Sequence, residues 1–130
     1  PWIMIGAGTG LAPFISFLKK RQAEQDSAPC WLFFGEQYVE HDAYFAKDLT
    51  AFQDQGILTR LDRAWSRSDG VYVPDLLQQS HKAIRQWVAE QGAHIYVCGS
   101  REGFGESVLA TLQDILPEPQ WQSQLHTDLY

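Results

Sequence analysis

Cysteine and histidine, the residues that most often build metal sites, are scarce and scattered in this sequence. Its two cysteines, Cys30 and Cys98, lie in different apolar runs, and its four histidines share no metal-ligand spacing. This pattern predicts neither a zinc site nor the disulfide framework of a small secreted domain. A reducing compartment, the cytoplasm, is therefore the simpler interpretation.

Long hydrophobic runs and an excess of basic charge are also missing. No apolar segment reaches the roughly 18–20 residues of a membrane span, and no signal-peptide pattern is recognisable. Ten Lys and Arg against sixteen Asp and Glu give a net charge of −6, which argues against nucleic acid or an anionic membrane as the main partner. What is present is a chain of 130 residues, 45% of them apolar, which is long enough for one domain with a buried core.

Glycine is concentrated near the start of the chain, where Gly6, Gly8 and Gly10 follow the apolar run Trp2–Ile5. A helix-compatible segment comes next, and Pro13 suits its first turn because its missing N–H would be unpaired there anyway. A strand that turns through glycines into a helix brings backbone N–H groups and the positive end of the helix dipole close to a phosphate. The spacing G-x-G-T-G matches neither the dinucleotide fingerprint G-x-G-x-x-G nor a P-loop. Taken alone, the loop is either a phosphate site or only a tight strand–helix turn.

Short apolar runs alternate with helical patterns along the rest of the chain. Further strands are expected at 30–34, 57–64 and 93–98, helices at 14–21, 44–52, 76–90 and 102–116, and extended pieces at 71–73 and 121–130. Strands that alternate with helices of this length predict βαβ units and a parallel sheet. We therefore expect an α/β fold: a doubly wound, Rossmann-like sheet of five parallel strands in the order 3-2-1-4-5, with helices on both faces. No second domain is evident, so residues 1–130 are expected to form one domain.

Ligands of such sheets bind beyond the carboxyl ends of the strands, and a polar segment follows the third predicted strand. Ser66, Arg67 and Ser68 place a guanidinium between two hydroxyls, which suits a phosphate or a carboxylate. The alternative is a polar loop whose serines bond their own backbone. Tyr72, a little further on, either contacts an adenine or a phosphate or is a core aromatic.

Two other candidates lie near the end of the chain. Cys98 ends the fourth predicted strand beside Gly99; a buried cysteine is most often inert, but at this edge the thiol would face a ligand crevice. The tail offers Asp128 and a terminal aromatic, Tyr130, which matters only if the preceding strand tethers it against a planar ligand. No serine–histidine or paired-carboxylate arrangement accompanies them, so the chain alone shows no complete catalytic set.

Five short motifs occur in a fixed order and span nearly the whole chain. They are GAGTGLAPF from Gly6, LFFG from Leu32, AWSR from Ala64, GAHIYVCG from Gly92 and DLY from Asp128. In this order they resemble the pyridine-nucleotide domain of the ferredoxin–NADP reductase superfamily. The resemblance is strongest to its diflavin reductases, and the final tyrosine favours the sulfite reductase flavoprotein branch.

The resemblance implies a role for each candidate residue. The cofactor would be NADPH, and two groups would hold its phosphates: Gly8, Thr9 and Gly10 the pyrophosphate, and Ser66, Arg67 and Tyr72 the adenosine 2′-phosphate. Cys98 with the adjoining Gly99, together with Asp128, would line the nicotinamide site and assist hydride transfer to FAD. Tyr130 would stack on the flavin ring and move aside for the nicotinamide.

The resemblance also implies partners outside this chain. Pro1 directly precedes an apolar strand, which suggests a piece of a longer polypeptide. A preceding FAD-binding domain would supply a further catalytic serine. An electron-acceptor protein or a flavodoxin-like domain with FMN would take the electrons onward.

Two alternatives remain open at this point. The chain could be a non-catalytic nucleotide- or protein-binding module on the same fold, although such a module would not need Cys98, Asp128 and Tyr130. It could also belong to an NADH-linked reductase with a single flavin. Arg67 is the one basic residue left in the matched 2′-phosphate segment, so a preference for NADPH would depend mainly on it.

Overall fold

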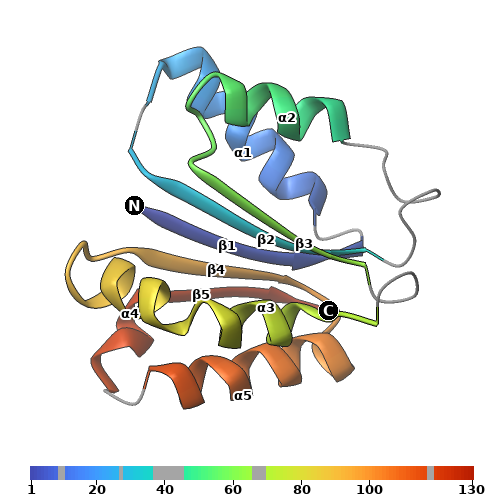
Figure 1. The fold of residues 1–130 in the computed structure, drawn as a ribbon, viewed down its shortest axis with the longest axis vertical. Helices are drawn as coiled ribbons and strands as arrows, with labels where there is room; N and C mark the ends of the chain where they lie inside the picture. Colours follow the sequence, from blue (N-terminus) through green and yellow to red (C-terminus); the bar gives the residue numbers. More distant parts are fainter. Residues whose placement is uncertain (9–10, 27, 37–45, 66–69, 117–118) are drawn as a thin grey trace.

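The computed structural model describes residues 1–8, 11–26, 28–36, 46–65, 70–116 and 119–130. Five strands form one parallel sheet (Figure 1), and each strand pairs with its neighbours in the order β3-β2-β1-β4-β5. The strands are β1 (Trp2–Ala7), β2 (Cys30–Glu36), β3 (Arg60–Trp65), β4 (His94–Gly99) and β5 (Leu125–Leu129). The predicted α/β fold and strand order are confirmed.

Helices pack on both faces of the sheet (Figure 1). The first group is α1 (Leu11–Glu24) and α2 (Ala46–Asp54), and the second is α3 (Val73–Gln79), α4 (His81–Ala89) and α5 (Glu106–Ile115). Two short helical segments, η2 (Arg101–Gly105) and η3 (Pro119–Gln124), precede α5 and β5. Within the described ranges, no helix is long and apolar enough to cross a membrane.

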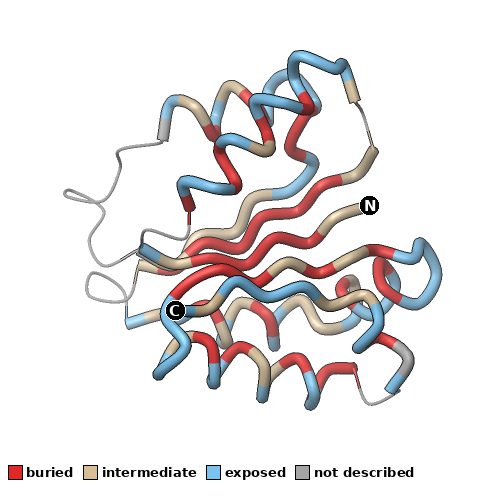
Figure 2. The backbone as a smooth tube through the Cα atoms, turned by 180° about the vertical axis from the view of Figure 1, so that it is seen from behind, coloured by how far each residue is buried: buried red, intermediate tan, exposed pale blue. Residues whose placement is uncertain are grey.

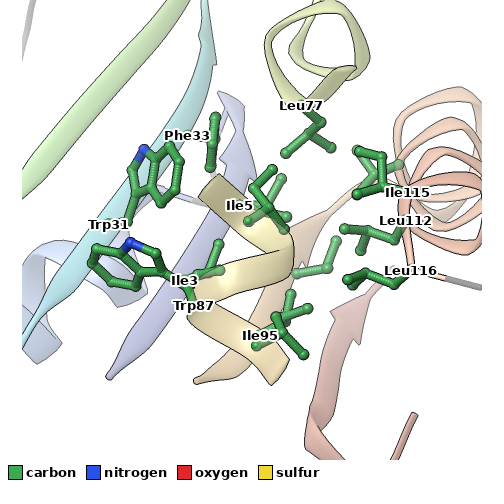
Figure 3. Close-up of a cluster of buried hydrophobic side chains, with 14 of the residues drawn as sticks. Ile3, Ile5, Trp31, Phe33, Leu77, Trp87, Ile95, Leu112, Ile115 and Leu116 are labelled. Carbon is green, nitrogen blue, oxygen red and sulfur yellow. The ribbon is translucent and has the colours of Figure 1, made fainter. Parts of the chain in front are cut away.

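Alternate residues of each strand enter two separate cores. On β1, Ile3 and Ile5 face the core under α3, α4 and α5, whereas Met4 faces the core under α1 and α2. Figure 3 shows the first core, in which Trp31 of β2 packs on Trp87 of α4 with ring centroids 5.3 Å apart. Burial on both faces explains why the central strands read as continuous apolar runs in the sequence.

The third strand begins later than its sequence predicts. Ile57 and Leu58 are buried, but their backbone N–H groups donate to the carbonyl oxygen of Phe52, at 2.9 and 3.1 Å. They therefore close the end of α2 instead of joining the ladder, and β3 starts at Arg60. The apolar character of Ile57 and Leu58 alone could not show whether they pair in a strand or close the end of a helix.

The long helix expected at 76–90 is two helices that meet at Ser80. The backbone of Ser80 is non-helical, with φ −106° and ψ 19°, and its N–H donates back to the carbonyls of Leu76 and Leu77. The break lets α3 pack on α5, β2 and β3 while α4 continues along the core. The prediction of a single helix here was wrong.

The helix expected at 102–116 starts at Glu106, because Glu102 and Gly103 leave the helical region in η2. Gly103 has φ 74°, which non-glycine residues rarely adopt. The expected extended tail is η3 followed by β5, an edge strand whose central residues 126–128 are exposed (Figure 2).

Candidate functional site

All five strands run in the same direction, so their carboxyl ends share one edge of the sheet. Gly8 follows β1 there with φ 57°, and a Cβ atom at this position would have nothing within 4 Å. The positive φ requires glycine, and the surrounding space leaves its backbone approachable by a ligand. Four other residues predicted for the phosphate sites, Thr9, Gly10, Ser66 and Arg67, lie outside the described residues.

Tyr72 is exposed at the start of α3. Its side chain is 57% exposed, which rules out the core role that the sequence left open. Its backbone N–H donates to the carboxylate of Asp75 at 2.9 Å, and this bond fixes the entry into the helix. The ring is thus exposed at the start of a helix that packs against β2 and β3.

Cys98 and Asp128 lie beside each other on neighbouring strands. They are paired residues in the parallel ladder of β4 and β5, and both line a pocket of about 430 Å³. The apolar wall of the pocket includes Phe14 and Phe17 of α1 and Tyr96 of β4. A flat ring that entered this pocket would meet aromatic and apolar surface along one side and the thiol and carboxylate together at one place.

The thiol in this pair is held in its neutral form. Burial raises the pKa of Cys98 above its ordinary value, and the nearby Asp128 carboxylate raises it further. Cys98 therefore offers an S–H group, not a thiolate, at neutral pH, and the negative charge of the pair resides on Asp128. This division favours a ligand that carries or develops positive charge near the carboxylate.

The end of the chain is tethered to the turn after β4. The backbone N–H of Tyr130 donates to the carbonyl of Gly99 at 3.1 Å, and the N–H of Arg101 donates to the carbonyl of Tyr130 at 2.9 Å. The Tyr130 side chain remains 64% exposed. Tyr130 is thus tethered through its backbone, and its proposed contact with a planar ligand stays a prediction.

Sequence reasoning missed the aromatic side chains that flank Asp128. His126 lines the same pocket, and its ring lies 4.6 Å from that of Tyr96 with ring planes 17° apart. His94 and His126 are in hydrogen-bond contact, with Nδ1 and Nε2 3.0 Å apart. Strand periodicity places Tyr96 on the same face as Cys98, and this signal could have found it. No group of three metal-ligating side chains occurs among the parts of the chain described here.

The fold and this edge together define a doubly wound α/β domain of the nucleotide-binding class. The family model of the oxidoreductase NAD-binding domain matches residues 4–109. The chain therefore belongs to the oxidoreductase NAD-binding domain family.

Individual proteins support this assignment. The chain is 40% identical over 120 residues to the sulfite reductase [NADPH] flavoprotein alpha-component of Photorhabdus laumondii, covering 91% of this chain and 20% of that protein. The corresponding protein of Yersinia pestis bv. Antiqua is 39% identical over 118 residues, covering 89% and 19%. The chain thus spans about a fifth of the length of these curated relatives.

A solved structure shares the fold. The ferredoxin-NADP+ reductase from Plasmodium falciparum superposes with a TM-score of 0.84 at 23% identity, over 99% of this chain and 51% of that one. The resemblance that the five motifs indicated is confirmed.

Proposed function

We propose that residues 1–130 form the NADP(H)-binding domain of a cytoplasmic flavin-dependent reductase. In this proposal the domain delivers hydride from NADPH to FAD, which is held mainly by a preceding domain of the same polypeptide. Electrons then pass to FMN in a flavodoxin-like domain or to a haem or iron–sulfur protein. The relatives named for NADPH and a flavoprotein support this proposal.

The observation that carries the proposal is the pairing of Cys98 with Asp128 beside a tethered chain end. A module that only bound nucleotide would need a phosphate loop but no thiol–carboxylate pair in a pocket. The pocket also fits a nicotinamide ring, because its volume of about 430 Å³ lies within the range of small-molecule sites and its walls are mostly apolar. NADPH, when bound, supplies a hydride from its nicotinamide ring.

Each residue of this chain then has a distinct task. The Asp128 carboxylate stabilises the positive charge that the nicotinamide ring gains as hydride leaves. The neutral Cys98 thiol fills the pocket wall beside it and offers a weak S–H donor. Phe14, Phe17 and Tyr96 exclude water from this side of the pocket, which strengthens the effect of the carboxylate.

The residues proposed to hold the phosphates of the cofactor are assigned from the sequence motifs. We propose that Gly8, Thr9 and Gly10 hold the pyrophosphate and that Ser66, Arg67 and Tyr72 hold the 2′-phosphate. The approachable backbone at Gly8 and the exposed ring of Tyr72 support these roles. Arg67 carries most of the discrimination between NADPH and NADH, since charge-assisted bonds to phosphate are stronger than neutral ones.

The test compares binding of both cofactors to the full-length flavoprotein and its Arg67→Ala variant. Loss of a charge-assisted contact costs about 1.5–3 kcal/mol, so we expect a tenfold to hundredfold loss of NADPH affinity with little change for NADH. Lys82→Ala, which removes an exposed positive charge on α4, should leave both affinities unchanged. An unchanged NADPH/NADH ratio in Arg67→Ala would assign the 2′-phosphate elsewhere or favour an NADH-linked reductase. Binding without any flavin reduction would favour the non-catalytic module.

A further inference from the structure

The turn before α5 packs closely on the end of β5, and a glycine makes this possible. A Cβ atom built at Gly105 would lie 3.0 and 3.1 Å from the two terminal methyl groups of Leu129 and 3.0 Å from the carbonyl oxygen of Ser100. Real Cβ atoms seldom approach other atoms so closely. The Leu129 side chain therefore occupies space that any other residue at position 105 would claim.

The backbone at Gly105 does not itself require glycine. Its φ of −60° and ψ of −47° are helical, and the residue is buried directly before the first turn of α5. Alanine adopts this backbone conformation without strain, so the position does not depend on the left-handed freedom of glycine. The advantage of glycine at this position is the room that it leaves for Leu129.

Leu129 connects this contact to the candidate site. It lies between Asp128 and Tyr130, and in the ladder it pairs with Gly99, next to Cys98. Its side chain packs against the core under α3–α5, on the opposite face of the strand from Asp128. Any displacement of Leu129 therefore moves the backbone that carries the carboxylate and the terminal ring.

Phe104 makes a second close contact here, with Gly99, the residue that pairs with Leu129 in the ladder. A Cβ atom at Gly99 would lie 2.7 Å from the Phe104 ring, so this ring packs closely beside the residue whose carbonyl accepts the Tyr130 hydrogen bond. The two backbone bonds of Tyr130, at 3.1 and 2.9 Å, therefore lie next to two close packing contacts.

We infer that Gly105 and Leu129 are a size-matched positioning pair, which sets where Asp128 and Tyr130 stand relative to Cys98. Neither residue touches the nicotinamide pocket, and both act through the backbone of β5. The inference rests on the proposed function, because it concerns the geometry of hydride transfer.

The test adds one methyl group at position 105 of the full-length flavoprotein and then shortens the side chain at position 129 by one carbon. In Gly105→Ala, the rate of flavin reduction measured by rapid mixing should fall about tenfold, since misplacement of reacting groups by 1 Å can cost about a hundredfold. The affinity for NADPH should stay within twofold of wild type, because the residues proposed to hold the phosphates lie elsewhere. Thermal stability should fall, because the added methyl group overpacks a buried position. Adding Leu129→Val to this variant should restore part of the rate, because it returns the space beside Leu129 but leaves the close approach to the Ser100 carbonyl.

Ser107→Ala, a change at an exposed position of the same helix, is the control and should keep the wild-type rate. A wild-type rate in Gly105→Ala, or no recovery in the double variant, overturns the inference. Hydrogen exchange at the amides of Arg101 and Tyr130 reports on the position of the end of β5 without requiring hydride transfer, so it tests the inference independently of the proposed function. If the wild-type protein transfers no hydride, the proposed function fails. In that case hydrogen exchange alone tests the positioning pair. Gly105→Ala should speed exchange at these two amides, and adding Leu129→Val should slow it again. Unchanged exchange in Gly105→Ala also overturns the inference.

Discussion

The two faces of the sheet differ in how far helices cover them. Under α3, α4 and α5 the core extends across all five strands, from Ala64 on β3 to the partly buried Leu125 and Leu129 on β5. On the other face, α1 and α2 cover the half formed by β1, β2 and β3, with Leu49 and Phe52 of α2 in that core. Beyond them, Tyr96 is half-buried and His126 is exposed.

Parallel sheets normally have both faces covered, so an uncovered strip is informative. The strip borders the pocket and carries Asp128 and the stacked Tyr96 and His126 rings, while Cys98 lines the pocket from the buried core under α1 and α2. The covered face therefore mainly stabilises the fold, and the open half of the other face carries the side chains proposed for chemistry. A change on each face should have separable consequences.

The largest contrast is expected between a core residue and a residue of the open strip. Leu112 of α5 is fully buried, and Leu112→Ala should lower the free energy of unfolding by about 2–5 kcal/mol. Tyr96→Ala should lower it by about 1 kcal/mol, because a half-exposed ring loses its stacking and part of its buried area. Urea unfolding of this domain, followed by tryptophan fluorescence, measures both. Equal losses would contradict the division between the faces.

The two thiols sharpen the comparison, because both face the α1 side but only Cys98 lines the open pocket. Burial raises the pKa of Cys30 from 9.0 to about 12, partly offset by the charge of Arg21. In the unfolded chain this thiol ionises near its ordinary pKa of 9.0. The neutral buried thiol therefore makes its full contribution to the free energy of unfolding below pH 9, and this contribution is lost as the pH rises from 9 towards 12. The slope is about 1.4 kcal/mol per pH unit.

Cys30→Ala should therefore flatten the fall of stability between pH 9 and pH 12 relative to wild type. Lysines and tyrosines titrate in the same range in both proteins, and the difference between the two curves removes their contribution. Cys98→Ala serves as the matched control and should retain most of the slope. Parallel curves for wild type and Cys30→Ala would show that Cys30 does not make this contribution.

The alternation of strands and helices was sufficient to predict the sheet, its order and the two helical layers. It could not place element ends that depend on contacts distant in sequence. Ile57 and Leu58 are as apolar as strand residues, yet they close α2. The break at Ser80 likewise follows from α3 packing on α5, which no local pattern encodes.

The candidate site was predicted one residue at a time and not as an arrangement. Cys98, Asp128 and Tyr130 were singled out by their positions at a strand end and in the tail, and the family resemblance supplied their roles. Cys98 and Asp128 lie side by side because β4 and β5 pair in the register that sets them opposite each other. Leu129, on the other face of β5, packs against the core under α3, α4 and α5. The contact between Gly105 and Leu129 has no sequence signature, because it depends on how closely two separate elements approach each other: a Cβ atom built at Gly105 would lie 3.0 Å from a Leu129 methyl group.

Removing the charge from the open strip should affect chemistry more than binding. Asp128→Asn keeps the shape of the side chain but not its negative charge, so flavin reduction should slow by about tenfold to a hundredfold. Affinity for 2′,5′-ADP, which lacks the nicotinamide, should stay nearly constant. The pKa of Cys98 should also fall, since Asp128 helps to raise it, so alkylation of this thiol should begin at lower pH. Wild-type rates and an unshifted alkylation profile would remove Asp128 from the proposed mechanism.

The smallest effect is expected at the chain end, where the proposed role of the ring is to occupy the place that the nicotinamide must take. Tyr130→Ser keeps the backbone groups that bond to Gly99 and Arg101 and removes the ring. A stacked aromatic contributes about 0.5–1.5 kcal/mol beyond its buried area, so competition with the nicotinamide is worth a severalfold change. We expect tighter binding of NADPH, slower release of NADP+ and a weaker preference against NADH. Tyr72→Ser, which removes the other exposed tyrosine ring, should instead weaken NADPH binding without helping NADH. If Tyr130→Ser reduces flavin at the wild-type rate with the wild-type cofactor preference, the tether holds the edge strand in place and the ring has no part in cofactor exchange.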